Sequence, residues 1–282
     1  MIALANTGKL IMQSENKENI VEVKKEGAVT VVYLNRPDKH NALTIDLFER
    51  IVEVGEEILH DDACRAVVLC GNGPSFCAGL DFKAMQGLME SPESAADILA
   101  RLFKRDDGPD NIAQRVAYIW RKIPVPVIAS LHGAVLGGGF QIALGADIRI
   151  AAPDAKFSIM EIRYGLIPDM GITQTLPGLM APDRALELAT SGRKIDAEEA
   201  LNGGLITRVD SDPYTASVAL ATQIAAQSPS AVRATKKLFH ESWRGDAEKT
   251  LALEESLQRQ LIGGADQVEA VTAAVEKRQA VF

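Results

Sequence analysis

The chain has 282 residues, of which 47% are hydrophobic and 24% charged, a balance that indicates a globular protein and excludes a disordered or collagen-like chain. Its 30 lysine and arginine residues against 38 aspartate and glutamate residues give a net charge of −8, which opposes broad binding to nucleic acid. Three cysteines without a CxxC pair (Cys64, Cys70 and Cys77) indicate neither a disulfide framework nor a structural zinc site, so we expect a reducing, cytoplasmic compartment.

The chain is expected to begin with a flexible arm, residues 1–18, because its apolar start is too short for a signal peptide and leads into a polar stretch. Two apolar runs, Val21–Val23 and Val29–Leu34, flank a glycine and predict a β-hairpin. Thr44 is a candidate N-cap. Apolar residues then recur every three to four positions over 45–59, which predicts an amphipathic helix with a solvated acidic face.

The next apolar run, Ala66–Cys70, predicts a short strand, and the loop Gly71–Gly79 after it is rich in glycine, proline and serine. Residues 90–112 mix serine, proline, aspartate and glycine with one apolar stripe. We expect a mobile flap there, in which Asp106-Asp107 and Asp110 are solvated rather than catalytic.

One uncharged segment, Ile123–Ala146, is long enough to cross a bilayer. Two prolines at its start and Gly137–Gly139 in its middle argue against a membrane helix, so we predict a strand over 125–131, a glycine turn and a buried helix over 138–144. Further strands are predicted over 147–151 and 157–160. The alternation of strands with helices predicts an α/β fold.

From Pro182 the pattern becomes helical, and the change over residues 178–208 is where we expect a boundary. Residues 19–205 would then form the α/β core. Residues 206–282 would form a helical oligomerisation region, because their apolar stripes need a partner, either the core or another subunit.

Several common catalytic and binding motifs are missing from the sequence. It has no GxGxxG, no GxxxxGK[ST], no GxSxG and no HExxH, and its four histidines lie far apart, so we predict no metal site. Two glycine-containing loops remain, residues 75–81 and 134–141, each at the end of an apolar strand. Glycine lets a ligand approach the backbone closely, and the start of a helix presents free N–H groups. Two such groups form an oxyanion hole; the alternative is that both loops are packing turns.

Together, these loops resemble those of the crotonase (enoyl-CoA hydratase/isomerase) family, and the resemblance runs from about Val21 to Phe282. The motifs that carry it are Asn35-Arg36-Pro37 with Asn41-Ala42-Leu43, the Phe76–Asp81 loop, Pro126–Ala129 with His132-Gly133, Gly137–Gly139, Ala146-Asp147, the run from Phe157 through Glu161, Gly165 and Pro168 to Thr173-Gln174, Ala200 with Gly204-Leu205, and Glu276-Lys277-Arg278.

The resemblance implies a spiral of ββα turns, a C-terminal helical trimerisation region, and assembly as a homotrimer or as a hexamer built from two trimers. It implies acyl-CoA substrates from fatty-acid β-oxidation, with coenzyme A entering as part of the thioester and no tightly bound cofactor. It implies no nucleic-acid or membrane partner. The family's oxyanion amides fall on Leu80 and Gly138, and its CoA-contacting positions fall on His40, Ala42, Ala78 and Phe82.

The acidic residues distinguish the reactions of the family. Its hydratases hold a water between two glutamates, whose positions fall here on Gln141 and Glu161, and a glutamine cannot act as a general acid or base. Glu161 alone resembles the base of the family's enoyl-CoA isomerases. Asp169 resembles the second acid of its dienoyl-CoA isomerases, although those enzymes usually carry an aspartate at the position of Gln141; a helix cap before Gly171 is the alternative for Asp169.

We therefore expect an isomerase that shifts a double bond in enoyl- or dienoyl-CoA, with Glu161 as proton-shuttling base, Asp169 as partner acid, and Gln141 orienting Glu161 or a water. Burial between Met160 and Ile162 would raise the pKa of Glu161 into a useful range. The first alternative is an enoyl-CoA hydratase that works with a single glutamate. The second is a non-catalytic scaffold that binds CoA thioesters or RNA.

Overall fold

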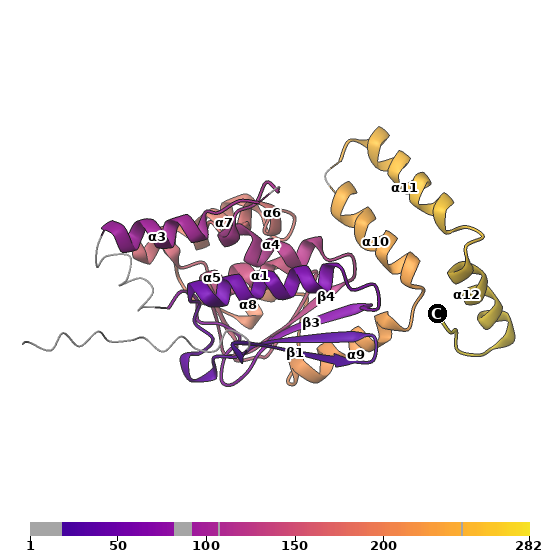
Figure 1. Cartoon of the computed structure of the whole chain (residues 1–282), viewed down its shortest axis with the longest axis horizontal. Coiled ribbons are helices and arrows are strands. Elements are labelled where there is room, and N and C mark those ends of the chain that lie inside the picture. Colours follow the sequence, from indigo (N-terminus) through magenta and orange to yellow (C-terminus); the bar gives the residue numbers. More distant parts are fainter. Residues whose placement is uncertain (1–18, 82–91, 107, 244) are drawn as a thin grey trace, which may run out of the picture.

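The computed structural model describes residues 19–81, 92–106, 108–243 and 245–282, and Figure 1 shows their arrangement. The arm predicted over residues 1–18 lies outside the described residues, as does Phe82. The described chain forms a body of two sheets with helices on them, and three C-terminal helices project from this body (Figure 1).

The larger sheet is the frame of the body. Its strands, in spatial order, are β1 (Val21–Glu26), β2 (Val29–Leu34), β3 (Ala66–Gly71), β4 (Val127–Leu131), β6 (Ile148–Ala151) and β9 (Arg208–Val209). β1 and β2 pair antiparallel, which confirms the predicted hairpin, and the pairs from β2 onward are parallel. β2, β3 and β4 are almost entirely buried, as aliphatic runs in parallel sheets usually are.

A smaller sheet pairs the strand before the glycine turn with two strands from later in the chain. Its strands are β5 (Ala134–Leu136), β7 (Lys156–Ser158) and β8 (Ile195–Asp196). The buried helix α5 (Gly138–Gly145) follows β5 after the single residue Gly137. The strand predicted over 125–131 is confirmed as β4, and the predicted turn and helix are confirmed by Gly137 and α5, whereas β5 between them was not predicted. The strand predicted over 157–160 is β7, which begins one residue earlier and ends at Ser158, and the short helix η3 (Glu161–Tyr164) follows. Within the described ranges, no helix is both long and apolar enough to span a bilayer.

The described part of the body also contains further helices. They are η2 (Pro37–Lys39), α1 (Ile45–Leu59), α3 (Pro92–Leu102), α4 (Ile112–Lys122), α6 (Ile172–Thr175), α7 (Pro182–Ser191), α8 (Ala197–Asn202) and α9 (Pro213–Ala225). Of these, α1 and α4 pack on one face of the larger sheet and α9 packs on the other. Thr44 caps α1 as predicted, since its hydroxyl accepts the Leu47 N–H at 3.3 Å. Strand residues alternate between two cores, so that Val32 faces α1 and α4, whereas Val31 faces α9.

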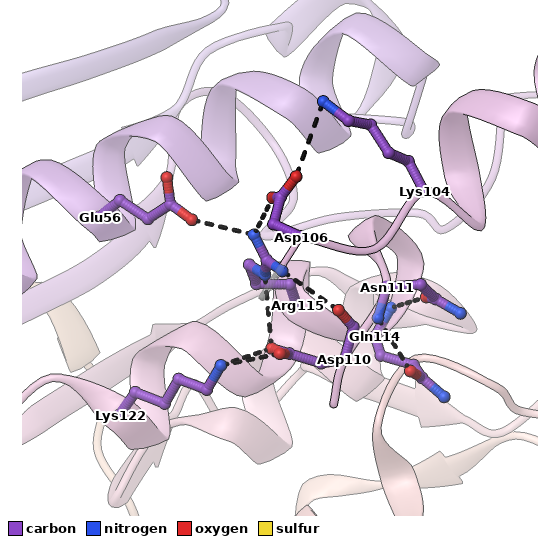
Figure 2. A network of polar contacts seen from close by, with 8 residues as sticks. All are labelled: Glu56, Lys104, Asp106, Asp110, Asn111, Gln114, Arg115 and Lys122. Atoms are coloured by element: carbon purple, nitrogen blue, oxygen red, sulfur yellow. Dashed lines mark hydrogen bonds and ion pairs between the residues drawn. The ribbon is translucent and has the colours of Figure 1, made fainter. Parts of the chain in front are cut away.

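Ion pairs hold the segment that joins α3 to α4 (Figure 2). Arg115, only 5% exposed, donates to Asp106 at 2.7 Å and pairs with Asp110 at 3.5 Å. Lys122 donates to both carboxylate oxygens of Asp110, at 2.7 and 2.9 Å. The expectation that Asp110 is solvated is therefore wrong, because this carboxylate is buried and paired. Where residues 92–112 are described, they form α3 and an anchored connection instead of the predicted flap.

Three helices follow the body: α10 (Pro229–Ser242), α11 (Ala247–Leu261) and α12 (Ala265–Glu276). α10 is attached to the body by Lys236, whose ammonium donates to the carbonyl oxygens of Trp120 and Val125 and pairs with Asp147 at 2.7 Å. The body extends past the boundary expected after residue 205, because β9 pairs with β6 and α9 covers the sheet.

Candidate active site

The two glycine-containing loops lie side by side. The N–H of Cys77 donates to the carbonyl oxygen of Ala134, and the N–H of Leu136 donates to that of Cys77, both at 3.0 Å, so that Cys77 and Val135 form a parallel bridge. Leu80 and Gly138 each follow the bridged residue of their own loop by three positions. The predicted oxyanion residues therefore each lie three residues beyond the bridge that joins the two loops.

The direction of the Leu80 amide follows from its neighbours. Leu43 donates its N–H to the Gly79 carbonyl at 2.8 Å and accepts the Asp81 N–H at 2.9 Å. The backbone groups on either side of Leu80, the Gly79 carbonyl and the Asp81 N–H, both face Leu43. Since these groups alternate in direction along an extended chain, the N–H of Leu80 itself points away from Leu43. That is the side on which the loop pairs with residues 134–136. Among the described residues, neither the Leu80 nor the Gly138 amide donates a hydrogen bond, so both are free to receive a ligand oxygen.

The turn into α5 uses two glycines. Gly137 has φ 51° and ψ −125°, a conformation that side chains other than hydrogen strongly disfavour. At Gly138 a Cβ atom would lie 2.7 Å from the sulfur of Met170 and 2.8 Å from Cδ1 of Leu43. Glycine at 137 thus permits the turn, and glycine at 138 leaves room for the side chains of Leu43 and Met170 beside the first amide of α5.

Glu161, the first residue of η3, lies against this turn. Its Oε1 would be 3.5 Å from a Cβ built on Gly137. Gln141, which is fully buried, donates Nε2–H to Glu161 Oε1 at 2.6 Å and accepts the Met170 N–H on Oε1 at 2.9 Å. Glu161 Oε2 is buried without a hydrogen-bond partner among the described residues. The amide of Gln141 therefore fixes the carboxylate of Glu161 and leaves one of its oxygens unused.

Burial raises the pKa of Glu161, and the negative charge of Asp169 raises it further. Asp169 directly precedes Met170 and is exposed as a residue, but partial burial of its carboxyl raises its pKa as well. The alternative interpretation of Asp169 as a helix cap is wrong. The residue before α6 is Gly171, in the left-handed conformation, and no side chain caps that helix.

Three of the four predicted CoA-contacting residues lie together beside Leu80. The N–H of Ala78 donates to the His40 carbonyl at 2.9 Å, and Ala42 lies two residues beyond His40. His40 is exposed, with φ 49°, and its Nδ1 lies 2.9 Å from the hydroxyl of Ser75. The fourth, Phe82, lies outside the described residues.

Sequence reasoning missed two residues that shape this site. Leu43 bonds to both sides of Leu80 and packs on Gly138, and the Met170 N–H orients Gln141. Both act through backbone groups or packing, for which the sequence carries no residue-specific signal. In the part of the chain that is described, no cluster of three or more histidine, cysteine, aspartate or glutamate residues is arranged to hold a metal.

Comparisons with known proteins identify the family of this chain. Residues 24–282 match the family described as enoyl-CoA hydratase/isomerase. The Delta(3,5)-Delta(2,4)-dienoyl-CoA isomerase of Mus musculus is 34% identical over 95% of this chain and 82% of its own length. The short-chain-enoyl-CoA hydratase of Clostridium acetobutylicum is 34% identical over 93% of this chain and 96% of its own.

A solved structure of an enoyl-CoA hydratase from Bacillus anthracis superposes with a TM-score of 0.83 at 30% identity, covering 93% of this chain and 98% of that one. The family match extends over most of the body and all the C-terminal helices, and the predicted α/β fold is confirmed. The chain belongs to the enoyl-CoA hydratase/isomerase family, the crotonases, whose members are enzymes that act on CoA thioesters.

Proposed function

We propose that this enzyme moves a double bond within an enoyl- or dienoyl-CoA thioester. In that reaction a base removes a proton from a carbon activated by the thioester, and the electron pair moves onto the thioester oxygen to give an enolate. A proton is then returned to a carbon further along the conjugated chain. No atom is gained or lost, so the reaction needs an oxyanion site and proton-transfer groups but no added water.

The amides of Leu80 and Gly138 would stabilise the enolate oxygen. Their N–H groups have no other acceptor among the described residues, and the backbone around each is fixed by hydrogen bonds or close packing. Removing one donor of such a pair typically raises the barrier by about 2.7–4 kcal/mol.

The proposal rests chiefly on the hydrogen bond from Gln141 to Glu161. A carboxamide does not ionise at neutral pH and so cannot act as a general acid or base, and both ends of this one are already engaged in hydrogen bonds. A second carboxylate at position 141, as in the family's hydratases, is therefore lacking. The ionisable neighbour of Glu161 is instead Asp169, whose charge raises the pKa of Glu161.

Glu161 and Asp169 would divide the proton transfers between them. Glu161 has one unpartnered buried oxygen and a raised pKa, which suit it to take a proton as general base. The raised pKa of Asp169 suits it to deliver one as partner acid. Gln141 would keep Glu161 oriented, and His40, Ala42, Ala78 and Phe82 would contact the CoA portion of the substrate.

The test is product analysis with a conjugated and a non-conjugated acyl-CoA. We expect double-bond migration by the wild type, and a loss of about 10²–10⁴-fold in Glu161→Gln, the usual contribution of a general base. Binding of a saturated acyl-CoA should persist in that variant, because the oxyanion amides are untouched. Wild-type turnover by Glu161→Gln would refute the role of Glu161.

A second candidate is hydration by a single glutamate. It is favoured by the similarity to a hydratase and by the free Oε2 of Glu161, which could activate a water molecule. Formation of 3-hydroxybutyryl-CoA from crotonyl-CoA, heavier by one water, would report water addition, since double-bond migration leaves the mass unchanged. Rapid hydration by the wild type, exceeding double-bond migration, would make this candidate the correct one.

A further inference from the structure

We propose that the buried ion pair between Arg36 and Asp81 positions the Leu80 amide, so that both residues support catalysis without contacting the substrate. The inference rests on the proposed function, because it concerns the oxyanion site of that reaction. Asp81 directly follows Leu80 in the chain. A constraint on Asp81 is therefore a constraint on the peptide unit that carries the oxyanion donor.

Arg36 joins the two segments that pair around Leu80. Its Nη1 donates to Asp81 Oδ2 at 3.2 Å and also to the carbonyl oxygen of Ala42. The side chains of Arg36 and Asp81 are only 8% and 13% exposed. Since Leu43, the next residue after Ala42, bonds to Gly79 and to Asp81, the guanidinium reinforces the backbone bridge that sets the direction of the Leu80 N–H.

The start of the same loop is fixed from the same segment. Asn41, fully buried with φ 54°, accepts the Arg36 N–H on Oδ1 at 2.7 Å. Its Nδ2 lies within hydrogen-bond distance of the carbonyl oxygens of Ser75, Asn72 and Phe76, at 2.9, 3.0 and 3.1 Å. Asn41 thus holds the loop before Leu80, and Arg36 holds it after Leu80.

Stability alone is a weak explanation for such a pair. Desolvating two charges offsets most of their attraction, so that apolar residues of similar size often serve the fold as well or better. What an arginine provides here is a rigid planar group whose Nη1 donates to both a carboxylate and a backbone carbonyl, a position that a flexible lysine ammonium holds less firmly. The pair lies one residue after an oxyanion amide. Orienting the Leu80 N–H therefore explains why the pair is present.

The test measures the oxyanion hydrogen bond directly. Hexanoyl-CoA labelled with carbon-13 at its thioester carbonyl is bound to each protein, and its C=O stretch is recorded by infrared difference spectroscopy. Hydrogen bonds from Leu80 and Gly138 should lower this frequency in the wild type relative to the free thioester. The variants are Asp81→Asn, which removes the charge at constant shape, and Arg36→Lys. Arg50→Lys is the matched control, because Arg50 pairs with Glu53 and Glu57 of its own helix α1.

We expect the band in Asp81→Asn and Arg36→Lys to move back toward the free thioester. The value of kcat should fall about 10- to 100-fold at nearly unchanged KM, because a small displacement of a catalytic group has effects of this size. Arg50→Lys should keep the wild-type band and rate. The band reports only folded, ligand-bound protein, so a change in stability does not mimic the effect.

Two failures are distinguishable. If the wild-type band coincides with that of free thioester, no oxyanion site exists and the proposed function itself is wrong. If the wild-type band is shifted and both variants keep that shift, the oxyanion site stands and Arg36 and Asp81 serve only the fold.

Discussion

Glu161 combines a functional advantage with a cost to the fold. Its carboxylate is buried, accepts a single side-chain hydrogen bond from Gln141, and has one oxygen without a partner among the described residues. The folded state therefore disfavours the ionised form, which raises the pKa. A base with a raised pKa accepts a proton more readily than an exposed carboxylate does, but ionising it at neutral pH destabilises the protein.

We predict that Glu161→Gln stabilises the fold at neutral pH. Because the folded-state pKa lies above the unfolded value, the carboxyl's contribution to stability is fully present below the unfolded pKa of about 4.3 and is lost as pH rises through the raised pKa of Glu161. The gain of the variant should grow over that window by about 1.4 kcal/mol per unit of pKa shift. Urea unfolding at pH 4 and pH 7 measures it, and an equal difference at both pH values would contradict the prediction.

At the scale of elements, ion pairs connect helices that the sequence pattern leaves unconnected. Arg115 of α4 donates to Glu56 of α1 at 3.1 Å, to Asp106 at 2.7 Å and to the backbone of Asp110 (Figure 2). Glu56 and Asp106 are half exposed, so their pairs with Arg115 are worth little. Asp110 is buried, so its pair with Arg115 contributes most to the stability of the fold.

Replacing Arg115 by methionine should lower the free energy of unfolding by about 3 kcal/mol, near the lower end for breaking a buried pair, because Asp110 keeps Lys122. Arg101→Met is the matched control. Arg101 also contacts α1, through Asp46 and Glu49, but is 44% exposed and should contribute less than about 1 kcal/mol. Chemical denaturation measures the free energy of unfolding of both variants. Equal losses in the two would contradict the larger contribution assigned to the buried pair.

At the scale of the whole molecule, the three projecting helices expose many apolar side chains. They include Phe239, Trp243, Leu251, Ile262, Val268, Val271 and Val275, each more than half exposed. Such surfaces usually mark contacts between chains. We propose that they assemble the enzyme into trimers or hexamers. Light scattering should then give three or six times the chain mass of 30.3 kDa, and a monomer would contradict this.

Local patterns predicted the local structure well. The hairpin, the cap at Thr44, the strand after α1, and the turn into α5 follow from periodicity, capping and glycine, which act over a few residues. Local patterns did not predict that the segment after α3 is anchored, because the ion pairs that hold it join residues far apart in the sequence. Arg115 and Glu56, for example, are 59 positions apart. The extent of the body did not follow either, because β9 and α9 join it through tertiary pairing.

The site shows the same division. The spacing of residues in the sequence indicated two glycine-containing loops, but only the tertiary bridge between Cys77 and Val135 brings these loops side by side. The two-sided engagement of Gln141 depends on the Met170 backbone and was not visible in the sequence. The capping interpretation of Asp169 failed because Gly171 enters α6 in the left-handed conformation.

The most direct measurement follows deuterium in an unsaturated acyl-CoA by NMR in deuterated water. The wild type should place deuterium in the migrated product. Glu161→Gln should lose exchange at the carbon beside the carbonyl together with product, whereas Asp169→Asn should keep that exchange and lose product. Undiminished exchange in Glu161→Gln, or a wild-type product that contains added water instead of a shifted double bond, would contradict the account.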